Sequence, residues 1–421
     1  MRSYPPSYEV APTGRVVAVV VPPGSKSLTN RALLVAALAE GVSDIRRPLR
    51  SDDTEAMRDC LARLGVEVTT VGDDFGVSGT GRLTPRTRVL DARGSGTTAR
   101  FITAAATIAD GEVIVDGNDR MRERPIGDLV DALEQLGADV EIIGSHGCPP
   151  VRVRGPQLAG GPARIDASRS SQYVSAIMMA APYATDPVTL RLGGPVVSRP
   201  YIQSTIDVMA AFGVEAVMRG DAVRIPLGRY AARDYVVEPD ASAAAYPWAA
   251  AAITGGSVTI GGISPTTSQA DIGFLGVLEA MGCSVTVESS TITVSGPEAL
   301  AGVDLDMNHC PDAVLAAAVV ASFAAGPTTI RNVGNLRIKE TDRLTALETE
   351  LRRLGHHAAT GDDWLQIVPG SPHGAVIKTY DDHRMAMSFA LAGLVVPGVI
   401  IDEPGCVAKT WPRFFDELER W

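Results

Sequence analysis

The sequence predicts an α/β fold built from six similar units that form two domains. A polar cluster, an Ala-rich helical stretch and a β-branched strand follow one another six times, at intervals of about 70 residues, which indicates a repeated supersecondary unit. The length of 421 residues exceeds one ordinary hydrophobic core. The sixth unit lacks its last strands, so we expect strands from elsewhere in the chain to complete it.

The first helix of each unit follows a polar cluster of the kind found at helix N-termini. These clusters are Ser25–Ser27, Gly94–Thr97, Ser168–Gln172, Asp240–Ser242, Cys310–Asp312 and Asp381–Arg384. In the first five units a second helix ends at a glycine, the residue expected after a helix C-terminus. These glycines are Gly65, Gly137, Gly213, Gly282 and Gly355. Strands such as 66–68 and 138–140 follow, so each unit is predicted to run strand, helix, strand, helix, strand, strand.

The second helix of the sixth unit, residues 412–420, has no strands after it. The segments 8–10 and 15–21 have strand character and precede the first helix, so we expect them to complete that unit. The chain then divides into a first domain of residues 22–238 and a second of residues 239–421 joined by 1–21. Two chain crossings near Pro22 and Pro239 would form the hinge.

Composition and charge exclude several classes of protein. Apolar residues make up 45% of the chain and charged residues 21%, which is enough to bury a core and too apolar for disorder. The net charge of −11 argues against nucleic-acid and membrane partners, which require a broad positive field. The longest apolar run, 313–325, is too short to span a bilayer, and 16–21 is too short for a signal sequence.

The five cysteines are odd in number, widely spaced and without a C-x-x-C pair, so we expect no disulfide framework and no zinc site. The pairs 309–310 and 356–357 lack further partners at metal-ligand spacing and predict no metal either. This cysteine usage fits a reducing compartment, and we expect a cytoplasmic protein.

The positions of the cationic residues favour a small anionic ligand. Three of the only four lysines, Lys26, Lys339 and Lys409, lie in polar motifs, and helix N-termini such as that at Lys26 attract anions. Lys339 and Arg343 are spaced i, i+4, where two cations on one helix face repel unless an anion lies between them. Further cations stand at Arg120, Arg122, Arg124 and Arg384, the first three spaced so that alternate side chains can face a cleft. We expect a ligand with several negative charges.

Motifs in a fixed order carry a family resemblance over nearly the whole chain. They are PGSKS-x-x-NR, Gly96-Thr97, RPIGDL, SSQ, SRPYI, PDA, N-x-R-x-KETDR, DDHRMAM and KTWP. This series resembles the 5-enolpyruvylshikimate-3-phosphate synthases, members of the enolpyruvyl transferases. The resemblance implies a two-domain inverse α/β barrel-like fold with three βαβαββ units in each domain. It also implies transfer of the enolpyruvyl group of phosphoenolpyruvate to the 5-hydroxyl of shikimate 3-phosphate, releasing phosphate, without a metal or organic cofactor. We expect a monomer.

The resemblance also carries site residues onto matching positions. For shikimate 3-phosphate it implies Lys26, Ser27, Arg31, Ser170, Ser171, Gln172, Ser198, Asp312, Asn335 and Lys339. For phosphoenolpyruvate it implies Lys26, Gly96, Arg124, Gln172, Arg343, Arg384 and Lys409. Asp312 resembles the base for the 5-hydroxyl, and Glu340, with Lys26 and His383, is the expected acid for the enol methylene. Because these residues come from both predicted domains, we expect the domains to close around the substrates.

Two alternatives remain open. Gly94, Gly96 and Ala99 match G-x-G-x-x-A after the strand 89–91, with Asp116 about twenty residues further on, which is the fingerprint of an NAD-dependent oxidoreductase. The second alternative is enolpyruvyl transfer to a UDP-sugar. Those relatives carry a cysteine in the loop before the position of Arg124, and residues 110–125 contain none.

The second helix opening departs from the family pattern. Gly94 stands where asparagine is usual, and Phe101 where many relatives have proline or leucine. In the family this segment lies against the phosphoenolpyruvate pocket. Sensitivity to glyphosate is therefore not part of what the resemblance implies for this chain.

Overall fold

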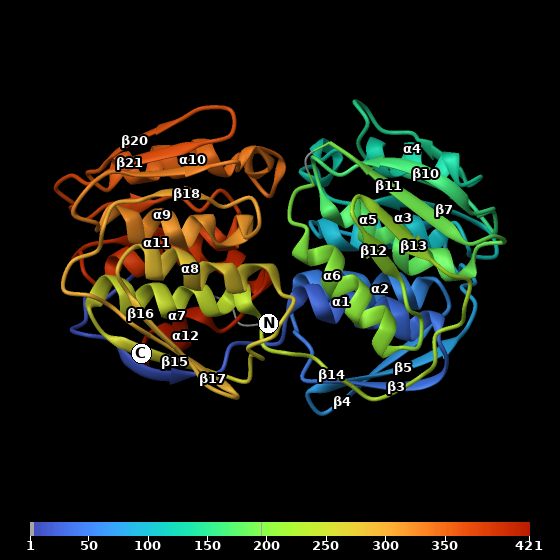
Figure 1. The fold of residues 1–421 in the computed structure, drawn as a ribbon, viewed down its shortest axis with the longest axis horizontal. Coiled ribbons are helices and arrows are strands. Elements are labelled where there is room, and N and C mark those ends of the chain that lie inside the picture. The colour runs from blue at the N-terminus through green and yellow to red at the C-terminus, as the bar shows by residue number, and fades with distance from the viewer. Residues whose placement is uncertain (1–3, 195) are drawn as a thin grey trace. The chain divides into compact units, whose positions relative to one another are not determined.

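The computed structural model describes residues 4–194 and 196–421. The chain forms two compact units (Figure 1). Gly24–Val237 make up one, called here the central unit. The split unit contains the described residues up to Pro23 and those from Glu238 onwards.

The central unit contains six α-helices and three four-stranded sheets among its described residues. The helices are α1 (Lys26–Leu38), α2 (Asp52–Arg63), α3 (Gly96–Ala106), α4 (Gly127–Gln135), α5 (Ser171–Ala180) and α6 (Pro200–Ala211). The first sheet has the order β14 (Tyr235–Val236), β3 (Glu40–Arg46), β5 (Asp74–Thr80), β4 (Glu67–Val71). The second is β6 (Val89–Asp91), β7 (Glu112–Asp116), β9 (Val151–Arg154), β8 (Asp139–Ile142), and the third β10 (Gly161–Asp166), β11 (Val188–Gly193), β13 (Ala222–Ile225), β12 (Val217–Arg219).

The split unit follows a similar plan. Its helices are α7 (Ala241–Thr254), α8 (Phe274–Ala280), α9 (Val314–Ser322), α10 (Arg343–Arg353), α11 (His383–Gly393) and α12 (Phe414–Leu418). Two sheets have four strands: β2 (Val17–Val20), β15 (Ser257–Gly261), β17 (Thr291–Ser295), β16 (Ser284–Val287), and β18 (Asp304–Asp306), β19 (Thr328–Arg331), β21 (Leu365–Val368), β20 (His357–Thr360). The third contains β22 (Val376–Ile377), β23 (Ile400–Asp402) and β1 (Ser7–Glu9).

All six sheets share one pairing pattern. The first strand pairs in parallel with the second, and the remaining neighbours pair antiparallel. In four sheets a buried helix connects the parallel pair, as α3 connects β6 to β7 and α9 connects β18 to β19. This helix crossover is the usual way to join parallel strands. The α/β class predicted from the sequence is confirmed.

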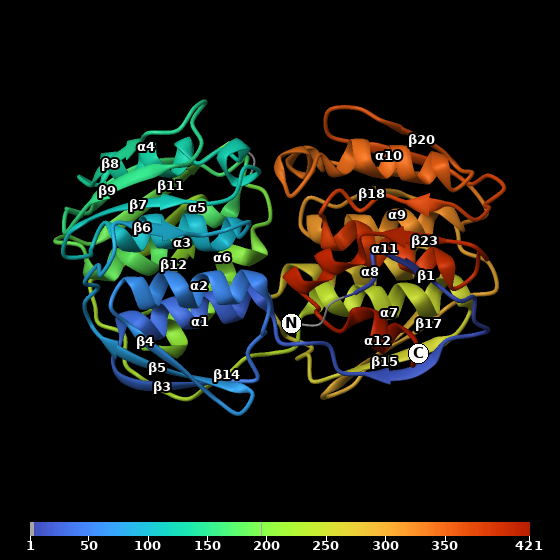
Figure 2. The ribbon, with the colours of Figure 1, turned by 180° about the vertical axis from the view of Figure 1, so that it is seen from behind.

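The N-terminal strands go to two different sheets. β1 pairs antiparallel with β23 (Figure 2), so it adds to the sheet of the sixth predicted repeat. The expectation that 15–21 joins the same sheet was wrong, because β2 pairs in parallel with β15. The chain passes from β2 into α1 of the central unit, and β14, which precedes α7, pairs instead with β3. The strand before α1 therefore lies in a sheet of the split unit, and the strand before α7 lies in a sheet of the central unit.

Each unit has its own hydrophobic core. The Ala-rich helices α1, α3, α5, α7, α9 and α11 are almost entirely buried, which suits alanine, the residue with the highest helix propensity. The predicted glycines follow the ends of α2, α4, α6, α8 and α10 with φ between 82° and 101°, a conformation that glycine adopts without strain. No helix in the described ranges is long and apolar enough to cross a membrane.

Candidate active site

The predicted polar clusters cap the buried helices. Ser25 accepts a hydrogen bond from the backbone N–H of Leu28, and Ser95 accepts one from that of Thr98. Ser170, Asp240 and Asp382 cap α5, α7 and α11 in the same way. A side-chain cap satisfies one of the open N–H groups and leaves the others at the helix N-terminus available to an anion.

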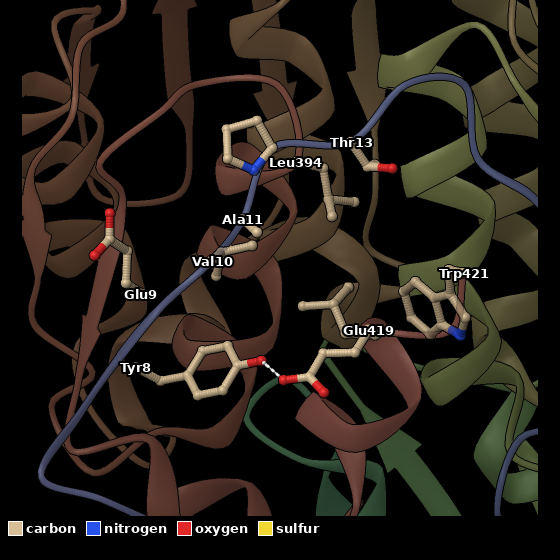
Figure 3. Close-up of a pocket in the computed structure, with 10 residues that line it drawn as sticks. Tyr8, Glu9, Val10, Ala11, Thr13, Leu394, Glu419 and Trp421 are labelled. Atoms are coloured by element: carbon tan, nitrogen blue, oxygen red, sulfur yellow. Dashed lines mark hydrogen bonds between the residues drawn. The ribbon is translucent and has the colours of Figure 1, made fainter.

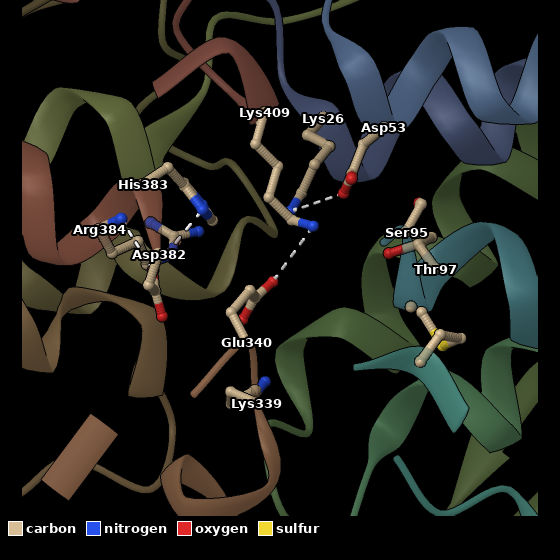
Figure 4. Close-up of polar contacts among 12 residues, drawn as sticks. Lys26, Asp53, Ser95, Thr97, Lys339, Glu340, Asp382, His383, Arg384 and Lys409 are labelled. Carbon is tan, nitrogen blue, oxygen red and sulfur yellow. Dashed lines mark hydrogen bonds and ion pairs between the residues drawn. The ribbon is translucent and has the colours of Figure 1, made fainter. Parts of the chain in front are cut away.

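Lys26 is held by a carboxylate that the sequence analysis did not identify. Lys26 Nζ lies 3.3 Å from Oδ2 of Asp53, and both side chains are largely buried (Figure 4). Asp53 belongs to the first turn of α2, next to Asp52. The only signal in the sequence was the pair of acidic residues at a helix N-terminus. This signal is weak, because solvent-exposed helices often begin with acidic residues as well.

Arg31 is buried in the central unit with several of its donors already used. Its Nε donates to the hydroxyl of Thr205 at 2.8 Å, and one Nη2 contact is the hydroxyl of Ser175 at 3.1 Å. The guanidinium also lies 5.2 Å from the centre of the Phe101 ring. Burial lowers the pKa of Arg31 to about 10, against the opposing effect of the neighbouring Tyr201. Arg31 therefore stays charged at neutral pH and is fixed in place.

Gly96 lies under two arginines. A Cβ atom at Gly96 would be 2.3 Å from Nη1 of Arg100 and 2.8 Å from Nη1 and Nη2 of Arg124. Arg100 donates to the carbonyl of Gly96 at 2.9 Å, and Arg124 is 6% exposed. The absence of a side chain at this helix start lets both cations approach the backbone.

The three predicted arginines before α4 do not share one environment. Arg120 pairs with Glu123, and Arg122 makes two hydrogen bonds to the carboxylate of Asp116. Arg122 is exposed and Arg120 is half-buried, whereas Arg124 is buried. Of this cluster, Arg124 is the residue that lies beside a helix N-terminus.

The remaining predicted residues of the central unit supply neutral donors. Gln172 Nε2 lies 3.4 Å from the hydroxyl of Thr97, so the starts of α5 and α3 are in contact. Ser171 and Ser198 are each 4% exposed, and Ser198 has a positive φ of 53°. A positive φ at a residue other than glycine is strained and often occurs at functional sites.

In the split unit, three cationic side chains lie beside the carboxylate of Asp312. Its Oδ1 accepts a hydrogen bond from Arg343 Nη1 at 3.1 Å, and its Oδ2 accepts one from Arg384 Nη2 at 2.8 Å. Lys339 Nζ lies 3.8 Å from Oδ1. These residues come from three separate stretches of the chain, so the predicted base and three predicted ligands form one cluster.

Arg343 is the centre of this cluster. It is fully buried and also bonds Asp382 at 2.7 Å and Glu340 at 2.9 Å. Burial alone would lower the pKa of Arg343, but the three surrounding carboxylates raise it above its ordinary value. The guanidinium is therefore charged and oriented before any ligand binds.

The expectation that Lys339 and Arg343 share one helix face was wrong. Asp342 caps α10 by accepting from the backbone N–H of Thr345 at 3.1 Å, so the helix begins only at Arg343. Lys339 ends the preceding 3₁₀ turn, Gly334–Ile338. The anion that lies between the two cations here is the carboxylate of Asp312.

The predicted acids occupy different environments. Glu340 lies between Arg343 and Lys409, whose Nζ is 3.9 Å from Oε1 (Figure 4). His383 is completely buried, with Nδ1 3.6 Å from Oδ1 of Asp382. The buried Oδ1 of Asn335 accepts no hydrogen bond from residues within the described ranges, so it can receive one from a ligand.

A separate cavity of about 330 Å³ contains none of the predicted site residues. It lies in the split unit along residues 8–13, near Leu394 and the last residues of the chain (Figure 3). The hydroxyl of Tyr8 donates to Glu419 at its edge. In the part of the chain that the structure describes, no group of three or more His, Cys, Asp and Glu residues is arranged to hold a metal ion.

The fold and these clusters define an α/β enzyme for multiply charged anions. Buried cations meet helix N-termini in both units, and in the split unit they also surround carboxylates that can exchange protons. Electrostatic stabilisation and acid–base catalysis are the chemistry that such a set of residues provides.

Comparison with known proteins identifies the family. The model of the EPSP synthase family (3-phosphoshikimate 1-carboxyvinyltransferase) matches residues 10–418. A 3-phosphoshikimate 1-carboxyvinyltransferase from Nostoc punctiforme is 47% identical over 414 residues, covering 96% of this chain and 97% of the relative. One from Methanoculleus marisnigri is 44% identical and covers 97% and 98%. This chain belongs to the EPSP synthase family.

Solved structures agree with this assignment. EPSP synthase from Acinetobacter baumannii is 25% identical, with a TM-score of 0.84 and 98% of each chain covered. The enolpyruvyl transferase NikO from Streptomyces tendae has a TM-score of 0.79 at 18% identity, which shows a shared fold alone. The predicted family, enzyme class and transfer from phosphoenolpyruvate to shikimate 3-phosphate are confirmed. Family membership favours this reaction over both alternatives, NAD-dependent oxidation and transfer to a UDP-sugar.

Proposed function

We propose that the two units divide the work of enolpyruvyl transfer. Neutral donors and Arg31 of the central unit bind shikimate 3-phosphate, and the Asp312 cluster of the split unit handles its reacting hydroxyl. The full set for shikimate 3-phosphate is Lys26, Ser27, Arg31, Ser170, Ser171, Gln172, Ser198, Asp312, Asn335 and Lys339. Phosphoenolpyruvate is bound by Lys26, Gly96, Arg124, Gln172, Arg343, Arg384 and Lys409. Each substrate thus takes ligands from both units, which act together as a monomer in the cytoplasm.

Asp312 acts as the base. Its carboxylate takes the proton of the 5-hydroxyl while that oxygen bonds to C2 of phosphoenolpyruvate. Lys339 and Arg343, which contact the same oxygen of Asp312, orient the carboxylate toward the hydroxyl. The observation that supports this role most directly is the meeting of Asp312 with three cations predicted to bind substrate.

Glu340 acts as the acid for the methylene carbon. When anionic phosphoenolpyruvate engages Lys409 and Arg343, it competes with Glu340 for these cations and adds negative charge beside it. Both effects favour the protonated carboxyl. Addition of the proton to the methylene gives a tetrahedral intermediate, which then loses phosphate from C2 and a proton from the new methyl group. His383, buried beside Asp382, and Lys26 support these proton transfers.

Electrostatic stabilisation supplies much of the rate. The intermediate carries a phosphate and a carboxylate on the carbon that is reacting, and Arg124, Arg343 and Lys409 are preorganised cations. Preorganised charges cost no reorganisation at the moment of reaction.

The direct test mixes the protein with shikimate 3-phosphate and phosphoenolpyruvate and measures phosphate release. Release should require both substrates and be matched by formation of the enolpyruvyl product. Replacing shikimate 3-phosphate by a UDP-sugar should give none. No release above background with both substrates present would refute the proposal.

A further inference from the structure

Asp271 is a buried carboxylate to which the mechanism above gives no role. It lies in the 3₁₀ turn Ala270–Gly273, directly before α8, and is 1% exposed. The hydroxyl of Ser242, in the first turn of α7, donates a hydrogen bond to Asp271 Oδ2. The turn packs against α7 and against the 3₁₀ turn Pro311–Ala313, which carries Asp312.

The surroundings of Asp271 connect it to the predicted base. Burial raises the pKa of Asp271 to about 6, and the negative charge of Asp312 contributes to the rise, whereas Arg384 opposes it. The groups that face Asp271 are Asp240 and Ser242 at the start of α7, Cys310 and Asp312 at the turn before α9, and Arg384 of α11. Asp271 and Asp312 therefore act on each other and on the same arginine.

Asp312 needs such a neighbour because cations weaken a base. Arg343, Arg384 and Lys339 all stabilise the ionised carboxylate of Asp312 and so reduce its affinity for a proton. A general base works best when its proton affinity is matched to the working pH. A negative charge near Asp312 raises the affinity of its carboxylate for a proton.

We propose that Asp271 is a positioning residue for Asp312, whose buried negative charge offsets part of the field of Arg384 and keeps Asp312 basic enough to accept the 5-hydroxyl proton. The proposal rests on the proposed function, in which Asp312 is that base. Asp271 needs no contact with substrate and neither gains nor loses a proton during turnover at neutral pH.

The first test compares Asp271→Asn with the wild type from pH 5 to pH 8.5. At pH 8 the variant should turn over about tenfold more slowly, because Asp312 has become a weaker base. At pH 5, where the wild-type Asp271 is itself protonated, the two rates should converge. The ratio of the rates removes the titration of the substrate phosphates, whose second pKa is about 6. The KM for shikimate 3-phosphate should stay within about twofold. A ratio that is the same at every pH would indicate a structural role and overturn the proposal.

Ser242→Ala provides a milder second variant. It keeps the carboxylate of Asp271 but removes a hydrogen bond to its ionised form, which Ser242 favours. The acid limb of the turnover profile should therefore move to higher pH, while the rate at pH 8.5 stays close to that of the wild type. An acid limb that does not move would contradict the proposal even if Asp271→Asn fails to fold.

A titration without substrates separates this proposal from the proposed function. With ¹³C-carboxyl-labelled aspartate, the signal of Asp271 is assigned by its loss in Asp271→Asn. Its titration should move to lower pH by about half a unit or more in Asp312→Asn, because that change removes a negative charge that helps to raise the pKa of Asp271. An unchanged titration would overturn the role of Asp271 in an enzyme that is fully active. If the wild type instead releases no phosphate, the proposed function fails, and the titration still decides whether the two carboxylates interact.

Discussion

Arg343 and Asp382 form a doubly hydrogen-bonded ion pair in which neither side chain is exposed to solvent. Nε of Arg343 lies 2.7 Å from Oδ2 of Asp382, and Nη2 lies 3.2 Å from Oδ1. The pair joins the first residue of α10 to the cap of α11. It leaves the outer edge of the guanidinium for Asp312 and Glu340, and so fixes the direction from which Arg343 can meet an anion.

Asp382→Asn should lower the free energy of unfolding by about 3–5 kcal/mol, because it removes the fully buried carboxylate that pairs with the fully buried guanidinium of Arg343. Denaturant unfolding measures this loss. Asp304→Asn is the matched control, since Asp304 also makes two hydrogen bonds to an arginine, Arg331, but both side chains are more than half exposed. That variant should lose about 1 kcal/mol or less. Equal losses in the two variants would show that the buried Arg343–Asp382 pair stabilises the protein no more than the exposed Arg331–Asp304 pair does.

Asp312→Asn should lower the turnover number by on the order of 10²-fold or more, because the amide keeps the shape of the side chain but cannot take a proton. Phosphate release measures turnover, and a binding titration should show that shikimate 3-phosphate still binds. Asp306→Asn, an exposed change in the strand just before this cluster, is the control and should leave turnover unchanged. Retained turnover in Asp312→Asn would make Asp312 a binding residue and not the base.

The helix starts could be predicted from the sequence because a cap acts over a few residues. Ser25, Ser170 and Asp382 each accept a hydrogen bond from a backbone N–H two or three residues later. Such a local interaction can be recognised from neighbouring residues in the sequence. The five glycines after the second helices are equally local. The start of α10 was missed because the alternating charges before Arg343 suit a helix as well as they suit the 3₁₀ turn that is present.

Gly96→Ala should raise the KM for phosphoenolpyruvate by about tenfold or more while changing stability little. The new methyl group would overlap the guanidinium ends of Arg100 and Arg124, which are flexible enough to move away, and the cations would then be displaced from their positions. Steady-state kinetics with each substrate varied in turn measures the effect. Gly276→Ala in α8 is the control, because no atom lies within 4 Å of its added Cβ. An unchanged KM in Gly96→Ala would remove Gly96 from the phosphoenolpyruvate site.

Lys409→Ala should weaken phosphoenolpyruvate binding selectively, by about 10- to 100-fold, the value of one hydrogen bond to a charged group. Its ammonium lies beside Glu340 and the Arg343 cluster. The exposed Lys378 provides the control, and Lys378→Ala should leave both KM values unchanged. An equal loss for both substrates in Lys409→Ala would contradict the assignment.

Partners that are distant in sequence could not be predicted. Nothing in the residues around Lys26 indicates Asp53, and Arg343 is 39 residues from Asp382. The same reason explains the misplaced strand: the valines of β2 predict a strand, but only tertiary packing selects β15 as its neighbour. Asp271 lies in an unremarkable segment and gains its significance from burial beside Asp312, which no local pattern reports.

His356 should make the protein less stable at acid pH. This ring is 3% exposed, packs edge-on against Phe323 and accepts a hydrogen bond at Nδ1 from the N–H of Gly370 at 3.2 Å. Burial, together with the nearby His357 and His373, lowers the pKa of His356 to about 4. In the unfolded chain its pKa is about 6.5. Between these values the unfolded chain binds a proton that the folded protein does not.

Stability should therefore fall as the pH falls from about 6.5 to 4, with a contribution from His356 of up to about 1.4 kcal/mol per pH unit. His356→Gln keeps an acceptor for Gly370 but does not titrate, so its disadvantage relative to the wild type at pH 7 should shrink steadily on acidification. Denaturant unfolding at pH 7, 6, 5 and 4 measures the difference. His146→Asn is the control, because it removes a histidine that is exposed and not buried. A difference between His356→Gln and the wild type that does not depend on pH would mean that His356 takes up its proton in the folded protein as readily as in the unfolded chain.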